Sequence, residues 1–98
     1  MSYTISVRRV AELDITDAFL DYEEKREGLG HDFLLCVEDA IYRIEKNPLH
    51  YQVVYKNLRR VLVRRFPYSI FYFVDEHKVI VTAVFHARRN PKLWDDRT

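Results

Sequence analysis

Residues 58–74 read LRRVLVRRFPYSIFYFV. β-branched and aromatic residues fill this segment, and such residues favour β-strands. Phe66-Pro67 interrupts the run, because proline has no backbone N–H to donate to a sheet and is expected at a turn or an edge. The segment therefore predicts two strands, residues 59–65 and 68–74, joined by a turn.

The segments on either side extend this sheet. Residues 79–85, VIVTAVF, are almost unbroken apolar residues and predict an interior strand covered on both faces. A polar turn at 75–78 precedes that strand, and residues 51–55 lead into the strand at 59–65. Because the connections are short, we expect these strands to form an antiparallel meander.

The N-terminal half predicts a short strand and two helices. Residues 3–7 alternate and are β-branched, which is typical of a strand. Residues 10–25 and 31–46 each carry one apolar stripe at helical spacing, with a glycine-containing loop at 28–30 between them. The sequence thus predicts an α+β fold of order β-α-α-β-β-β, with the N-terminal strand and helical hairpin packed on a curved antiparallel sheet. It does not place the first strand in the sheet order.

Composition narrows the class of protein. A chain of 98 residues predicts a single domain, residues 1–98, and no apolar run approaches the ~18–20 residues of a membrane helix. The one cysteine, Cys36, cannot form an internal disulfide and favours a cytoplasmic protein. Residues 1–50 carry 6 Lys and Arg against 11 Asp and Glu, a net charge of −5, whereas residues 51–98 carry 10 against 4, a net charge of +6. The basic half suits an anionic partner, although these charges could also simply mark solvated faces.

Several stretches together resemble the ParE branch of the RelE/ParE toxin superfamily. They cover nearly the whole chain in the family's order: residues 11–15, residues 28–30 followed by Phe33, Asn47-Pro48, residues 58–72, and residues 83–91 followed by Trp94 and Arg97. The combination of an arginine-rich strand, Phe-Pro-Tyr and His-x-Arg-Arg-x-Pro is the specific part of this pattern.

The resemblance implies the toxin of a type II toxin–antitoxin system. Such toxins are small cytoplasmic proteins that arrest growth, and a directly bound cognate antitoxin, here ParD-like or similar, neutralises them in a hetero-oligomer. ParE-type members inhibit DNA gyrase by binding it, whereas RelE-type members cleave messenger RNA on the ribosome. A third alternative is a non-toxic module that binds an antitoxin and serves plasmid stabilisation, because a fold does not dictate its function.

Two positions bear on the choice between these activities. RNA cleavage needs a general acid, a general base and positive charge on the phosphate. The position at which RelE-type nucleases supply one such arginine matches Ser69, which is neutral and short. His86 stands at the end of the last strand, where many nucleases of this kind place an acid, so a ribonuclease would use His86 with Arg65 and Arg88, or with Arg60. Because Ser69 stands where that arginine is expected, the sequence favours a protein that binds its target and is not an enzyme.

Partner contacts are expected on the cationic strand and tail. Strand alternation predicts Arg60 and Arg64 on one face with Leu62, and Arg59 and Arg65 on the other. The predicted partner-binding residues are Arg59, Arg60, Arg64, Arg65, Arg88, Arg89 and Trp94. These arginines could instead protect a sheet edge against aggregation. No cofactor motif is present, and the histidines show no metal-binding spacing.

Overall fold

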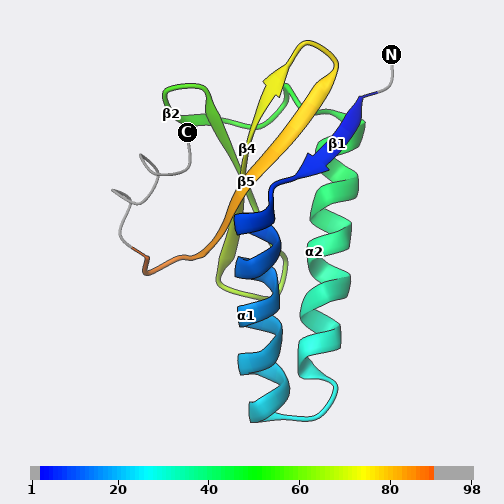
Figure 1. The fold of residues 1–98 in the computed structure, drawn as a ribbon, viewed down its shortest axis with the longest axis vertical. Helices are drawn as coiled ribbons and strands as arrows, with labels where there is room; N and C mark the ends of the chain where they lie inside the picture. The colour runs from blue at the N-terminus through cyan, green and yellow to red at the C-terminus, as the bar shows by residue number, and fades with distance from the viewer. Residues whose placement is uncertain (1–2, 90–98) are drawn as a thin grey trace.

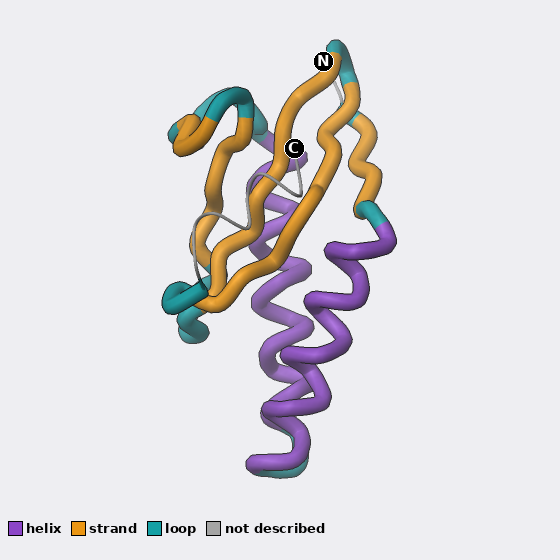
Figure 2. Tube along the Cα trace, turned by 60° about the vertical axis from the view of Figure 1, so that its left-hand side comes forward, coloured by secondary structure: helices purple, strands orange, loops and turns teal. Residues whose placement is uncertain are grey.

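The computed structural model describes residues 3–89 of the chain. It contains a helical hairpin and one five-stranded sheet in the spatial order β1-β5-β4-β3-β2 (Figure 1). The elements in chain order are β1 (Thr4–Val7), α1 (Arg9–Lys25), α2 (Leu29–Lys46), β2 (Val53–Tyr55), β3 (Leu58–Leu62), β4 (Tyr68–Asp75) and β5 (Lys78–His86). The predicted α+β class is confirmed. The loop end of the hairpin projects beyond the sheet (Figure 2).

The sheet is mixed, because β1 joins it in parallel. Thr4 pairs with Lys78 and Val7 pairs with Val81, so β1 lies beside β5 at one edge. The strands from β2 to β5 form the predicted antiparallel meander. A parallel pair needs a long crossover between its strands, and the helical hairpin lies within that crossover.

The arginine-rich segment is shorter and more broken than the sequence predicted. A turn at Lys56, whose φ is 50°, separates β2 from β3, so four strands and not three follow the helices. β3 ends at Leu62, and Arg65 lies in the next turn with a φ of 72°, in the left-handed region. The prediction of a strand through residue 65 was therefore wrong, because the turn that precedes Pro67 begins three residues earlier.

The helical hairpin matches its predicted boundaries to within two residues. Gly28 adopts a φ of 88° between the helices, a conformation that glycine tolerates without steric cost. At Gly30 a Cβ atom would lie 2.6 Å from the backbone oxygen of Phe19, so only glycine allows this close approach of α2 to α1.

Side chains from α2 and one face of the sheet form the main core. Phe33, Val37 and Ile44 of α2 are buried there with Val61 and Ile70. A smaller cluster, formed by Phe71, Ala83 and Phe85 with Val54 against it, is made by the alternate strand residues and belongs to the opposite face.

A β-bulge in β5 places two residues that are three positions apart on the same face of the sheet. The register moves from Phe71↔Ala83 to Tyr72↔Val81, which leaves Thr82 as the extra residue. Val81 and Val84 therefore both face the helices, while Ala83 faces away. The apolar run at 79–85 is buried on both faces, as predicted for an interior strand.

A carboxylate from α1 completes the edge of β5 where β1 ends. The backbone N–H of Val84 donates to Asp14 Oδ2 at 3.0 Å, and the N–H of Arg8 donates to the Val81 carbonyl at 3.0 Å. The hydrogen bond at Asp14 thus satisfies an amide that no β1 residue reaches.

We expect Asp14→Ala to destabilise the protein by about 1–3 kcal/mol, because a buried N–H loses its acceptor. Asp14→Asn keeps an acceptor oxygen and should be closer to the wild type. Urea denaturation followed by circular dichroism measures both free energies of unfolding. Equal stability of Asp14→Ala and the wild type would show that the Val84 amide finds another acceptor.

Glu23 gives the hairpin loop a pH-dependent contact. Desolvation raises the pKa of Glu23, but hydrogen bonds from Gly28, Gly30 and His31 outweigh it and lower the pKa below the ordinary 4.5. The N–H of Gly30 donates to Glu23 Oε1 at 2.8 Å. Because the folded-state pKa is lowered, this contribution to stability is present above pH 4.5 and is lost as the pH falls through the lowered pKa.

We therefore expect wild type to exceed Glu23→Gln in unfolding free energy at pH 7, with a difference that narrows below about pH 4.5. Glu24→Gln, at the exposed neighbouring position, is the matched control and should show no such narrowing. Urea denaturation across pH 3–7 measures the two differences. A constant difference for Glu23→Gln would contradict the assignment.

Candidate functional site

A hollow lies on the sheet face opposite the helices, where β3, β4 and β5 come together. Its volume is about 230 Å³, and it is lined by Arg60, Leu62, Ser69, Phe71, Phe85, His86, Ala87 and Arg89. Ser69 is paired with Leu62 on one side and with Phe85 on the other, which brings the three strands to the same level. We call this the face hollow.

The face hollow is cationic. Arg60 is exposed on β3, and the guanidinium carbon of Arg89 lies 4.8 Å from the ring centroid of Phe85. Its lining within residues 3–89 contains no Asp or Glu. Two guanidinium groups over an apolar floor suit an anionic group on a macromolecule.

The environment of His86 favours a structural role. Its Nδ1 atom accepts a hydrogen bond of 3.0 Å from the backbone N–H of Arg88, and its ring meets the Tyr68 ring edge-on at 5.2 Å. An Nδ1 atom that accepts this hydrogen bond cannot itself hold a proton without losing the bond. The geometry therefore works against His86 as a general acid.

Comparison with known proteins identifies the family. The family model "ParE toxin of type II toxin-antitoxin system, parDE" matches residues 5–91. The chain belongs to this ParE toxin family. Among curated proteins, none matches the chain.

Two solved structures share the fold of this ParE-family toxin. A chain of the chromosomal ParDE system from P. aeruginosa is 13% identical with a TM-score of 0.66, and the match covers 86% of this chain and 95% of that one. A chain of the toxin–antitoxin complex RelBE2 from Mycobacterium tuberculosis is 18% identical with a TM-score of 0.64, covering 88% and 99%. At these identities the likeness establishes the fold.

Ser69 lies inside the face hollow, next to the β5 end that carries His86. Ser69 is only 5% exposed and uncharged, so in this ParE-family toxin the hollow has a neutral group at that point.

The predicted arginine cluster separates into groups with different surroundings. Arg59 turns toward the helix side, where its Nη1 atom donates to the carbonyls of Tyr51 at 2.6 Å and Leu49 at 3.2 Å. Its cross-strand neighbour Tyr72 donates from its hydroxyl to the Pro48 carbonyl at 2.6 Å. Burial raises the pKa of Tyr72, and Arg59 offsets only part of this rise. Arg59 therefore holds the loop after α2 in place.

The two turn arginines lie against acidic residues of α2. Arg64 is 3.7 Å from Asp39, and Arg65 is 4.0 Å from Asp32. Both arginine side chains are about two-thirds exposed, at 68% and 66%, and such exposed pairs contribute little stability. These guanidinium groups can exchange their partners easily. Arg88 is exposed beside His86.

A second hollow contains an arginine that the sequence did not single out. It has a volume of about 370 Å³ and is lined by Arg43, His50, Tyr51, Gln52, Arg60, Val61 and Leu62. We call it the edge hollow. Arg43 donates from Nε to Asp39 at 3.1 Å and from Nη2 to the Leu62 carbonyl at 3.2 Å. The i,i+4 spacing of Asp39 and Arg43 was a signal for the first contact.

Two of the residues singled out from the sequence belong to the C-terminal tail. Trp94 and Arg97 lie outside residues 3–89. Within residues 3–89, no three His, Cys, Asp or Glu side chains are grouped as metal ligands would be. None of the helices described is long and apolar enough to cross a membrane.

Arg59 and Arg60 are adjacent and carry the same charge, so they form a matched pair. We expect Arg59→Ala to lower the free energy of unfolding by roughly 1–3 kcal/mol, because two carbonyls lose a charged donor. Arg60→Ala is exposed and should stay within about 0.5 kcal/mol of the wild type. Urea denaturation tests this. Equal losses would contradict the division of the two side chains between the faces of β3.

Proposed function

We propose that this type II toxin–antitoxin toxin arrests growth by binding DNA gyrase and is neutralised by a cognate antitoxin. Membership of the ParE family supports this proposal. Such an action places the protein in the cytoplasm, where gyrase and DNA are found. In this proposal the face hollow, with Arg60 and Arg89, contacts an anionic group of the gyrase–DNA complex.

The observation that carries the proposal is that the described lining of the face hollow has cations to bind an anion but no complete set of groups to cleave RNA. It offers two guanidinium groups, yet Ser69 is neutral, His86 Nδ1 is already bonded, and the described lining residues include no carboxylate. Binding an anion needs only the cations, whereas cleaving RNA needs a proton donor and a proton acceptor as well.

The same hollow carries one observation in favour of a ribosome-dependent ribonuclease. His86 lies with Arg60 and Arg89 around a single space, so an imidazole and two cations could meet one phosphate. In that alternative His86 Nε2 would exchange the proton, with Arg65 or Arg88 as further cations. His86→Ala would then abolish activity, whereas a toxin that binds gyrase should tolerate it in a folded variant.

The proposal is tested with purified protein in a gyrase supercoiling assay that also records trapped cleaved DNA. We expect inhibition by the wild type, and a loss of about tenfold or more in potency for Arg60→Ala or Arg89→Ala, since a charge-assisted contact contributes roughly 1.5–3 kcal/mol. Arg9→Ala, on the exposed start of α1, is the matched control and should retain potency.

Controlled expression in cells separates the remaining alternatives. Mapped message cleavage that disappears with His86→Ala would replace the gyrase target with the ribosome. Soluble protein without growth arrest would point to a non-toxic antitoxin-binding module. Growth arrest with intact messages and gyrase-linked DNA damage is the expected result.

A further inference from the structure

We infer that the segment Phe66-Pro67-Tyr68 positions Arg89 at the face hollow, and so holds this cation ready to meet an anionic group. The three residues act as positioning residues, because none of them is among the described residues that line the hollow. The inference rests on the proposed function, since the face hollow is the binding site in that proposal. It adds the residues outside the hollow on which binding would depend.

Two aromatic side chains anchor this segment to the helical hairpin. The ring centroid of Phe66 lies 4.9 Å from that of Tyr22 on α1 and 5.3 Å from that of Phe33 on α2. The ring centroid of Tyr68 lies 5.1 Å from that of Phe33. Phe33 is fully buried, so both anchoring rings pack against a close-packed part of the core.

Pro67 turns the chain between these two rings. The N–H of Tyr68 donates to the Phe66 carbonyl at 2.8 Å, which closes a three-residue turn around the proline. Because the proline ring fixes φ, it limits the conformations open to this turn. The Pro67 carbonyl accepts a hydrogen bond of 2.7 Å from the N–H of Ala87, the residue that follows β5. The turn therefore holds the chain at the point where β5 ends.

Tyr68 makes a second contact with the end of β5. It pairs with His86 in the sheet, and the two rings meet edge-on at 5.2 Å. Burial is the main cause that raises the pKa of Tyr68, and the positive charge of Arg89 opposes this rise. Tyr68 is therefore in contact with the end of β5 and close enough to Arg89 to feel its charge.

A tight turn carries these contacts on to Arg89. The N–H of Arg89 donates to the His86 carbonyl at 2.9 Å, and the N–H of Arg88 donates to His86 Nδ1 at 3.0 Å. This turn brings Arg89 back over β5, where its guanidinium carbon lies 4.8 Å from the ring centroid of Phe85. A free arginine side chain has many rotamers, so a fixed backbone and an aromatic platform reduce the entropy that it loses on binding an anion.

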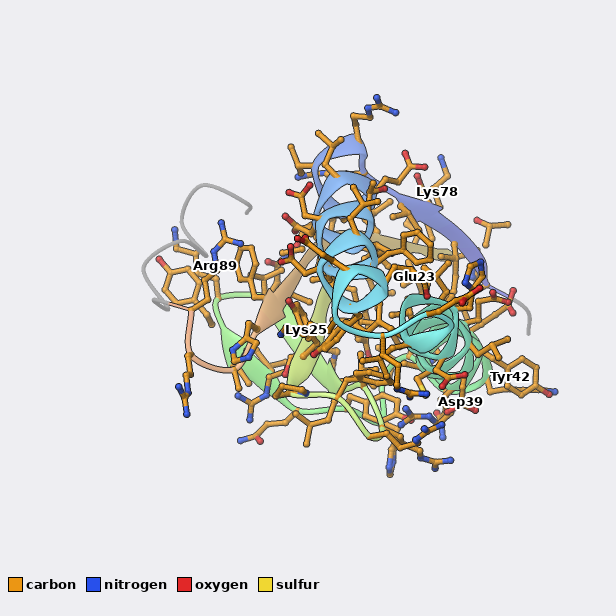
Figure 3. The ribbon with its side chains drawn as sticks, turned by 90° about the horizontal axis from the view of Figure 1, so that it is seen from below. Glu23, Lys25, Asp39, Tyr42, Lys78 and Arg89 are labelled. Carbon is orange, nitrogen blue, oxygen red and sulfur yellow. The ribbon has the colours of Figure 1, made fainter. Side chains whose placement is uncertain are left out.

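The arginine on the other side of the segment has different surroundings. Arg64 precedes Phe66 and lies 3.7 Å from Asp39 of α2. Figure 3 shows Asp39 and Arg89 on different sides of the molecule. Asp39 therefore does not compensate the charge of Arg89, and the contacts at the end of β5 are the ones that hold this cation in place.

NMR spectroscopy of the full-length toxin reads the position of Arg89 directly. Protons held over the face of an aromatic ring resonate upfield, so Phe85 should shift the side-chain protons of Arg89 upfield. We expect Tyr68→Leu and Pro67→Ala each to remove most of this shift. Tyr68→Phe keeps the ring beside His86 and should retain the shift. Pro67 is exposed, so Pro67→Ala decides the test if Tyr68→Leu does not fold.

Pro48→Ala is the matched control for Pro67→Ala. The Pro48 carbonyl also accepts a hydrogen bond, at 2.6 Å from the Tyr72 hydroxyl, but it belongs to the loop after α2. We expect Pro48→Ala to leave the Arg89 signals unchanged. A residue with only a structural role lowers the free energy of unfolding without moving these signals.

A double-mutant cycle in the gyrase supercoiling assay gives the second measurement. Arg89→Ala should lower potency by about tenfold or more in the wild type, but by only about threefold or less in Tyr68→Leu or Pro67→Ala, where Arg89 is no longer held in place. Equal losses in all backgrounds would overturn the inference. So would Arg89 signals that stay unchanged in the folded variants.

The two measurements separate this inference from the proposed function. If the wild type leaves gyrase unaffected, the gyrase target is wrong, and the NMR signals still decide whether the segment positions Arg89. If gyrase is inhibited but none of the variants moves the Arg89 signals, the target stands and the positioning role is wrong.

Discussion

One face of the sheet is buried against α2 through Phe33, Val37 and Ile44. This burial determines which strand side chains enter the core and which reach the opposite face. Side chains alternate between the faces of a strand, so a residue either joins the buried core or emerges opposite the helices. Arg59 and Arg60 show the consequence. They are neighbours in the chain and chemically identical. Arg59 donates hydrogen bonds to the loop after α2, whereas Arg60 lines both the face hollow and the edge hollow.

In the fold, acidic residues from the first half of the sequence lie opposite basic residues from the second half. α2 supplies Asp32 and Asp39, and the turn between β3 and β4 supplies Arg64 and Arg65 opposite them. These contacts are long and exposed, so they organise the turn without immobilising it. The cationic surface is therefore not uniform: it is partly compensated beside α2 and uncompensated among the lining residues of the face hollow.

Features that depend on local spacing could be predicted from the sequence, and those that depend on distant contacts could not. The helix boundaries followed from apolar stripes and glycines, and Ser69 and His86, both discussed from the sequence, line the same hollow. The bulge at Thr82 was hidden, because an unbroken apolar run has no alternation to interrupt. The roles of Arg59 and Arg43 depend on carbonyl groups of other segments, and composition does not reveal such partners.

The parallel pairing of Thr4–Val7 with residues 78–81 has a consequence for synthesis of the protein. In the chain, β1 comes before both helices, and its partner β5 comes after the other strands of the sheet. Closing a loop of this length carries a large entropic cost, and such distant pairing slows folding. A nascent chain therefore cannot complete this sheet until β5 has left the ribosome.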